Sequence, residues 1–367
     1  MVNLIKYNIK YNIRNMIIIL LKLSFIILIV LVKVKEIYDY IKNYEDKTVV
    51  SSNSRNNNLL EKIPIAFSID HKYTYPLVVL LTSILYNSSP KTNYSFHILV
   101  PSHFPEADLN DILGLGKIFQ NCEFIIHDMG ESYKNWKVFG MYSTTVYYRL
   151  SLSDIIKDLD KIIYLDCDTM VHKDLTEFYN IEMREYYYMG FPGHEIGYME
   201  INGTRNFINS GVMLINLKEL RKINATQLFA NYYNKFGTKK VDEYLINAVF
   251  YNKIKFLPFI YGIPDFQPEW VIRSPTIFYN SLKGFCPGTP EDMINASKNR
   301  VITHGAYTGH KWWLKDYYES TDIGKKWYFY ATKTHLFDKI CEKYRGTKNI
   351  CDKIKLDIQK NFNEYID

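Results

Sequence analysis

The sequence predicts an α/β fold with a mostly parallel central sheet that is covered by helices on both faces. Segments whose apolar residues are spaced as in a strand alternate with segments whose apolar residues are spaced as in a helix. This order of elements is typical of parallel sheets. One apolar segment, Ile162–Leu165, is followed at once by two aspartates, as at the end of a central strand. The 367 residues, 47% of them hydrophobic, suffice for a large core in one or two domains.

The segment from Ile63 to Ile126 predicts three strands and two helices. In chain order these are a strand at Ile63–Ile69, a helix at Pro76–Tyr86, a strand at Tyr94–Val100, a helix at Pro105–Gly114 and a strand at Glu123–Ile126. Ligands of such sheets bind beyond the carboxyl ends of the strands. Asp70, which follows the first strand, is therefore expected at the binding edge.

The next segments bring three charged residues to the same edge. Tyr147–Ile156 predicts a helix that carries Arg149 there. Asp166 and Asp168 lie two residues apart, so in extended backbone both side chains leave on one face. Two carboxylates at such a point suit Mg²⁺ or Mn²⁺ holding a diphosphate. The alternative is that these aspartates only begin a turn, where Asp is common, and the spacing alone does not decide between the two.

Two later segments contain further candidates. Phe207–Leu217 predicts a loop that enters a buried strand, where Gly211 would let the backbone approach a ligand closely. A glycine at the start of a strand is also typical of a bulge. Asp242 and Glu243 open an amphipathic stretch, and for this pair taken alone the sequence favours acids placed at a helix N-terminus.

The run Ile302–Trp313 groups an imidazole, small residues and an ammonium within a few positions. His304 would complete a metal site begun by the two aspartates, and Lys311 would neutralise a phosphate. A single His or Lys is usually structural, so it is the grouping that indicates a site.

The charge of the chain argues against nucleic-acid binding. The net charge of +6 comes from scattered lysines, without a basic stripe.

The N-terminus predicts a membrane anchor. Met16–Val32 is almost wholly apolar and is preceded by Lys6, Lys10 and Arg14, which favours a cytosolic tail over 1–15, an anchor over 16–32 and a lumenal body. A cleaved signal peptide is the alternative, although no cleavage site of the usual type follows. Residues 33–62 are polar and predict a flexible stem. We therefore expect a single-pass type II membrane protein of the Golgi or endoplasmic reticulum, and five N-glycosylation sequons support this only weakly.

Five cysteines are present, and Cys341 and Cys351 could pair in an oxidising compartment. An odd count leaves at least one thiol unpaired, for which Cys167 is the candidate.

Taken in order, these segments resemble glycosyltransferase family 8, over roughly Ile63 to Trp313. The matching pieces are the opening strand with Asp70, Tyr147–Leu150, Tyr164–Thr169, Asn209–Asn216, Asp242-Glu243 and the run from His304 to Trp313. The resemblance implies a GT-A nucleotide-sugar transferase fold. We expect the catalytic domain to cover 63–335 and a C-terminal helical extension to cover 336–367. The resemblance also implies a UDP-sugar donor and Mn²⁺, or Mg²⁺, held by Asp166, Asp168 and His304.

The same resemblance assigns the other site residues. Ser68 and Asp70 would meet the uracil end of the donor, Arg149 and Asn209 the donor, Gly211 the sugar pocket and Lys311 the diphosphate. Asp242 and Glu243 would lie beside the transferred sugar, so that catalysis is assigned to Asp242, Glu243 and Asn209. The donor-binding set is completed by Tyr73, Cys167, Ser210 and Gly309.

Three departures from the family pattern are visible. The family commonly has Asp-Gln where this chain has Asp242-Glu243, its usual H-x-x-G-x-x-K-P-W is respaced here with Trp312 replacing proline, and Lys72 replaces an uncharged residue. They bear on the donor sugar and on the loop around the phosphates.

The expected activity is the retaining transfer of a hexose, glucose or galactose, to a glycan, glycolipid or glycoprotein acceptor. Retention by same-face attack is the leading hypothesis, and Glu243 acting as a nucleophile is its alternative. Two other functions stay open. One is an inactive GT-A-fold protein that binds sugar or acts as a scaffold, and the other is a glycogenin-like self-glucosylating protein, which the predicted anchor disfavours.

Overall fold

The computed structural model describes residues 35, 50–51, 61–140, 142–193, 207–238, 241–264, 288–305, 311–314, 318 and 321–361. The chain divides at 49/50, and the described residues from 50 onward belong to one compact unit. The predicted tail and anchor, and most of the predicted stem, lie outside the described residues. Among the residues that are described, no helix has both the length and the apolar character needed to cross a bilayer.

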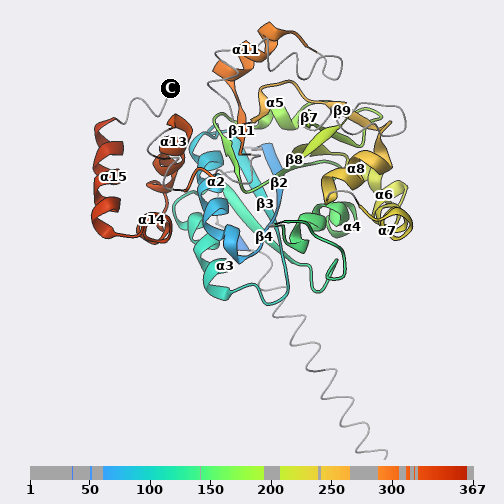
Figure 1. Cartoon of the computed structure of the whole chain (residues 1–367), viewed down its shortest axis with the longest axis horizontal. Helices are drawn as coiled ribbons and strands as arrows, with labels where there is room; N and C mark the ends of the chain where they lie inside the picture. Colours follow the sequence, from blue (N-terminus) through green and yellow to red (C-terminus); the bar gives the residue numbers. More distant parts are fainter. Residues whose placement is uncertain are drawn as a thin grey trace, which may run out of the picture. The chain divides into compact units, whose positions relative to one another are not determined.

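An eight-stranded sheet forms the centre of the unit of residues 50–367 (Figure 1). In spatial order its strands are β1 (Val50–Ser51), β4 (Cys122–Asp128), β3 (Thr92–Val100), β2 (Glu61–Ser68), β5 (Ile162–Leu165), β8 (Ile208–Ile215), β7 (Tyr188–Pro192) and β9 (Ile254–Phe256). β1 and β8 run opposite to the other strands. The mostly parallel sheet predicted from the sequence is confirmed. β1 and the start of β2 fall within the predicted stem, so part of that segment belongs to the sheet.

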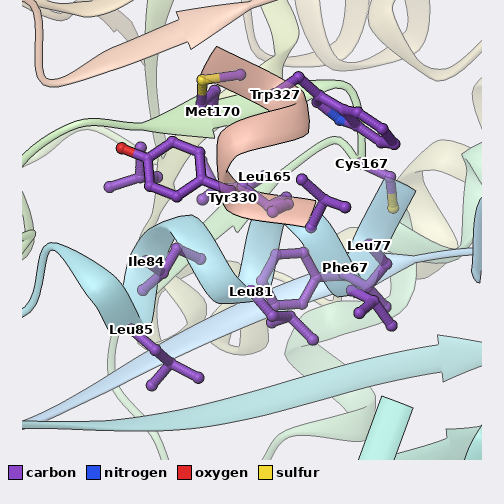
Figure 2. Packing of buried hydrophobic residues seen from close by; sticks show 14 of the residues in the cluster. Phe67, Leu77, Leu81, Ile84, Leu85, Leu165, Cys167, Met170, Trp327 and Tyr330 are labelled. Atoms are coloured by element: carbon purple, nitrogen blue, oxygen red, sulfur yellow. The ribbon is translucent and has the colours of Figure 1, made fainter. Parts of the chain in front are cut away.

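Helices cover both faces of this sheet. On one side lie α2 (Thr74–Tyr86), α3 (Glu106–Leu113), α13 (Asp322–Ala331), α14 (Phe337–Arg345) and α15 (Lys348–Lys360), and on the other lie α4 (Leu152–Ile155), α6 (Leu217–Lys222), α7 (Ala225–Phe236) and α8 (Asp242–Phe250) (Figure 1). Strand alternation produces the two cores: Ile65 and Phe67 of β2 enter the first, while Ala66 enters the second. In Figure 2, Phe67 packs with Leu77 and Leu81 of α2, beneath Trp327 and Tyr330 of α13.

A second, three-stranded sheet brings a distant part of the chain to the end of β5. It consists of β10 (Tyr261–Pro264), β11 (Ile302–His304) and β6 (Thr169–Val171). β11 runs antiparallel to β6, with His304 opposite Thr169. The remaining elements are α5 (Thr176–Tyr179), α11 (Pro290–Asn299) and the 3₁₀ helices η1 (His71–Tyr73), η2 (Gly114–Lys117) and η3 (Thr144–Ser151).

Two predicted elements differ in the structure. The helix predicted over Tyr147–Ile156 is the 3₁₀ helix η3 followed by the short helix α4. The loop predicted before the buried strand at Phe207–Leu217 is strand already from Ile208, so that Gly211 lies within β8. The reason is pairing with β7 and β5, which are distant in sequence: Pro192 lies opposite Ile208, and the amide of Asp166 donates to the carbonyl of Gly211 at 2.8 Å.

The predicted pairing of Cys341 with Cys351 is confirmed, and this disulfide joins α14 to α15. Cys167 is a free, buried thiol, as expected, and Cys122 is a second one. The fifth cysteine, Cys286, lies outside the described residues. α14 and α15 pack on the same core as β2 and α2. The predicted boundary between the catalytic domain and the C-terminal extension, at 335/336, stays a prediction.

Candidate functional site

The two aspartates lie in a turn at the end of β5. The amide of Thr169 donates to the carbonyl of Asp166 at 3.1 Å, so the backbone from 166 to 169 is not extended. The sequence-based reason for placing both carboxylates on one face was therefore wrong, and the turn interpretation of the backbone is correct. The two carboxylates still converge, because the turn folds both side chains toward β11.

The ladder between β6 and β11 positions His304 beside this turn. The amide of Gly305 donates to the carbonyl of Asp168 at 2.7 Å. As a result the Nε2 atom of His304 lies 3.3 Å from Asp168 Oδ1 and 3.8 Å from Asp166 Oδ2. The imidazole and both carboxylates, from positions far apart in sequence, face one point.

The donor set fits a divalent cation. One ligand atom from each of Asp166, Asp168 and His304 lies within 4.8 Å of the other two. Two carboxylates and an imidazole form a mixed oxygen and nitrogen donor set of the kind that divalent transition-metal ions accept. Gly211 leaves room for them, since a Cβ atom there would stand 2.2 Å from His304 Cε1 and 2.7 Å from Asp166 Oδ2. These residues would hold the ion.

Replacing Gly211 by Ala is expected to weaken Mn²⁺ binding by about 10- to 100-fold, the effect typical of displaced metal ligands or their supports. The added methyl group would push His304 and Asp166 apart. Isothermal titration with Mn²⁺ measures the effect. Gly116→Ala is the matched control, because a Cβ atom there has its nearest neighbour, a Phe124 ring carbon, at an ordinary 3.5 Å. Equal Mn²⁺ affinity in the two variants would contradict the site.

Lys311 lies beside the metal-ligand group. Its ammonium forms an ion pair with Asp168 Oδ2 and donates to the carbonyl of Gly305 at 2.8 Å. Burial raises the pKa of Asp168, but Lys311 and His304 outweigh it and hold that pKa below the ordinary value. Asp168 is thus kept as a carboxylate, the form that binds a cation.

Arg149 joins the metal-ligand group to the start of α8. Its Nη2 atom donates to Asp166 Oδ1 at 2.8 Å, its Nε atom lies 3.1 Å from Asp242 Oδ2, and its Nη1 atom donates to the carbonyl of Ser210 at 2.6 Å. The Arg149 and Asp242 side chains are only 4% and 3% exposed. Burial raises the pKa of Asp242, and the neighbouring Arg149 opposes that shift. Arg149 fixes two carboxylates that would otherwise repel each other.

Glu243 is bonded to the residues that precede Gly211. Its Oε2 atom accepts from Asn209 Nδ2 at 2.8 Å and from the amide of Ser210 at 3.3 Å. Asp242 and Glu243 also occupy the first turn of α8, as the structural interpretation predicted. Asp242 and Glu243 therefore begin a helix and also contact Arg149 and β8 within the site.

The remaining predicted residues that the structure describes lie at the same sheet edge. Ser68 ends β2, and Asp70 caps η1 by accepting from the amide of Lys72 at 2.9 Å. The Tyr73 ring packs against Trp313, with ring centres 6.2 Å apart, and burial and the carboxylates of Asp168 and Asp166 raise the pKa of its phenol. Cys167 is buried between the aspartates. Gly309 lies outside the described residues.

Two tyrosines at the site were not predicted. Tyr164 donates to Asp166 Oδ1 at 3.2 Å, and the Arg149 guanidinium lies 4.2 Å from its ring centre. The two-residue spacing from Asp166 was the available signal. Tyr142 is half exposed, and burial together with nearby Glu243 and Asp166 raises its pKa to about 12. No sequence pattern marked Tyr142, because it lies in a loop.

Comparison with known proteins finds similarity to glycosyltransferases. A family model described as glycosyl transferase family 8 matches residues 64–266. A Haemophilus influenzae protein whose glycosyltransferase name is itself provisional is 30% identical over 203 residues, which are 53% of this chain and 61% of that protein. A lipopolysaccharide 1,2-glucosyltransferase of Escherichia coli is 24% identical over 54% of this chain and 61% of its own length. The matched segments thus span less than two thirds of these relatives.

Among solved structures, the galactosyltransferase LgtC in complex with donor and acceptor sugar analogs superposes with a TM-score of 0.61. The superposition covers 74% of this chain and 96% of LgtC, at 20% sequence identity, and shows a shared fold. The family model covers more than half of the chain and includes Asp166, Asp168, Gly211 and Glu243. The chain belongs to glycosyltransferase family 8.

Proposed function

We propose that the protein is a retaining glycosyltransferase that moves a hexose from a UDP-sugar to a glycan, glycolipid or glycoprotein acceptor and uses Mn²⁺ or Mg²⁺. The observation that carries the proposal is the convergence of Asp166, Asp168 and His304 on one point, with Lys311 next to them. A cation-binding group beside an ammonium suits the diphosphate of a nucleotide sugar. The names of the relatives support glycosyl transfer but do not identify the donor or the acceptor.

We assign a role to each residue of the site. Asp166, Asp168 and His304 would hold the ion, whose positive charge would stabilise the leaving diphosphate. Lys311 would contact the same diphosphate. Arg149 orients Asp166 and Asp242, and Asn209 is held by Glu243 on the β8 side of the site. In this proposal the carboxylates of Asp242 and Glu243 lie beside the transferred sugar, where negative charge stabilises an oxocarbenium-like centre.

The test is binding and turnover of UDP-sugars with and without the metal. We expect UDP to bind more tightly with Mn²⁺ than with EDTA, and at least one of UDP-glucose, UDP-galactose, UDP-xylose and UDP-N-acetylglucosamine to be consumed. A protein that binds UDP-sugar but releases no UDP with any of these donors would instead be an inactive sugar-binding protein. No gain in UDP affinity from Mn²⁺ would contradict the proposal.

Glu243→Gln separates two routes to retention. The glutamine oxygen can still accept from Asn209 and Ser210, so the local bonds survive while the charge is lost. For same-face attack, the route we favour, turnover falls about tenfold or less, whereas removing an enzymic nucleophile costs on the order of 10⁴-fold or more. UDP release under saturating donor measures it, with the exposed Glu182→Gln as control. A loss of the larger size would make Glu243 the nucleophile.

The compartment is also a proposal. The disulfide between Cys341 and Cys351 supports folding in an oxidising environment, in agreement with a body held in the lumen of the Golgi or endoplasmic reticulum by the predicted anchor at 16–32.

A further inference from the structure

The segment that carries Lys311 joins the candidate site to the C-terminal helices. Residues 311–314 form a turn in which the amide of Leu314 donates to the carbonyl of Lys311 at 2.9 Å. At one end of this turn the Lys311 ammonium meets Asp168 and Gly305. The two central residues of the turn are buried tryptophans, Trp312 with 1% and Trp313 with 7% of its surface exposed.

The two tryptophans pack in different directions. Trp312 lies against Gly305, where a Cβ atom would come within 3.1 Å of the indole ring. Trp313 lies against Tyr73 on the site side and against Trp327 and Tyr344 on the helical side, with ring centres 5.8 to 6.2 Å apart. Trp313 is therefore the link between the lysine and the C-terminal helices.

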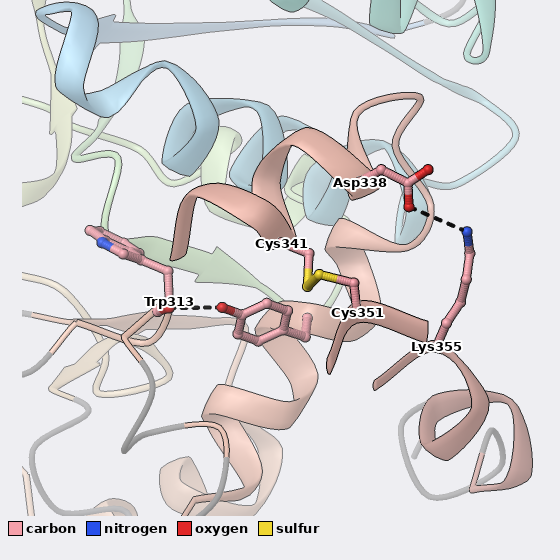
Figure 3. The surroundings of a disulfide bond; sticks show 6 residues. Trp313, Asp338, Cys341, Cys351 and Lys355 are labelled. Atoms are coloured by element: carbon pink, nitrogen blue, oxygen red, sulfur yellow. Dashed lines mark hydrogen bonds and ion pairs between the residues drawn. A yellow bond between two sulfur atoms is a disulfide. The ribbon is translucent and has the colours of Figure 1, made fainter. Parts of the chain in front are cut away.

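Residues of α13 and α14 hold this link, and α15 is attached to α14. The hydroxyl of Tyr328 on α13 donates to the carbonyl of Trp313 at 2.8 Å, a bond buried from solvent (Figure 3). Tyr344 of α14 packs on both Trp313 and Trp327, and the Arg345 guanidinium lies 5.9 Å from the Tyr328 ring centre. α14 is in turn fixed to α15 by the disulfide and by the Asp338–Lys355 ion pair at 3.7 Å (Figure 3).

We propose that the disulfide-linked helices α14 and α15, together with α13, position Lys311 for the diphosphate, with Tyr328 as the positioning residue that acts through Trp313. The inference rests on the proposed function for the ligand that Lys311 meets. A lysine side chain loses much rotamer freedom when it is fixed, so a firm backbone beneath it lowers the cost of placing its charge. The helices contribute no group to the site itself.

Tyr328→Phe tests the proposal, because it removes only the hydroxyl that bonds Trp313. Tyr330→Phe is the matched control: it removes a buried hydroxyl from the same helix, one that bonds Asn87 instead. The first readout uses no nucleotide. An amine-reactive reagent is applied to the purified full chain, and modification of Lys311, now 12% exposed, is followed by mass spectrometry. We expect about fivefold faster modification of Lys311 in Tyr328→Phe, the equivalent of one lost hydrogen bond, and no change in Tyr330→Phe.

The second readout is affinity for UDP compared with uridine, in the presence of Mn²⁺. Tyr328→Phe should weaken UDP by about fivefold and leave uridine unchanged, since uridine has no phosphate for Lys311 to meet. In a Lys311→Ala background the same change should have no further effect on UDP, because variants acting through one residue are not additive. A purely structural role for Tyr328 would weaken both ligands and would add to Lys311→Ala.

The two readouts separate this inference from the proposed function. If Lys311→Ala leaves UDP affinity unchanged while Tyr328→Phe exposes Lys311 to the reagent, the helices position the lysine and its assigned ligand is wrong. The double variant Cys341→Ser, Cys351→Ser should also speed Lys311 modification, since it frees α14 from α15. Unchanged Lys311 modification in both Tyr328→Phe and the cysteine variant overturns the proposal.

Discussion

Asp168→Asn is expected to abolish metal-dependent turnover, with a loss on the order of 10³-fold or more, because it removes a charged ligand from the centre that stabilises the leaving diphosphate. Asp168 is the residue that both His304 and Lys311 contact. Asparagine keeps the volume of the side chain but not the charge that the low pKa of Asp168 maintains. UDP release in the presence of Mn²⁺, and the gain in UDP affinity that Mn²⁺ produces, measure the effect.

The control for Asp168→Asn is Asp160→Asn. Asp160 is a surface carboxylate, 69% exposed, that pairs with Lys218 at 3.1 Å. This variant should turn over donor as the unmodified protein does. Circular dichroism and the urea midpoint establish that Asp168→Asn is folded. Turnover retained by a folded Asp168→Asn protein would rule out the metal assignment and, with it, the mechanism proposed for donor cleavage.

Arg149→Met is expected to cost about 3–5 kcal/mol of the free energy of unfolding, the cost of leaving buried charges without their partner. Asp242 is buried beneath the guanidinium, and Asp166 loses the donor at 2.8 Å that also orients it. Methionine fills much of the volume of the arginine stem, so the loss reports charge rather than a cavity. Urea denaturation followed by fluorescence measures the change.

Two further variants decide what causes that loss. Asp242→Asn added to Arg149→Met should recover part of the stability, since it removes the carboxylate that the arginine neutralises. Arg184→Met, which breaks an exposed pair with Glu182, should change stability by no more than about 1 kcal/mol. If Arg149→Met unfolds at the same urea concentration as the unmodified protein, the buried ion-pair network does not stabilise the fold.

Most of the fold was predictable because its elements carry local signals. β2, α2, β3, α3 and β4 follow from residue periodicity, and each agrees with the sequence-based segment to within a few residues. The failures have a common cause. Arg149 lies in a 3₁₀ helix and Gly211 lies inside a strand because of contacts with β5, β7 and α8, which residue periodicity does not record.

The sequence alone determined which chemical groups the protein has: two aspartates after a buried strand, a histidine and a lysine in a late segment, and a pair of cysteines near the end. The tertiary structure decided how the side chains of the site contact one another. Asp168 and Lys311 are 143 residues apart, Asn209 and Glu243 are 34 apart, and Arg149 and Asp166 are 17 apart. The physical reason is that register between strands and burial of charge depend on the packed chain, whereas a sequence pattern records only neighbours. The turn at Asp166, the ladder from β6 to β11 and the buried Arg149 form the site together.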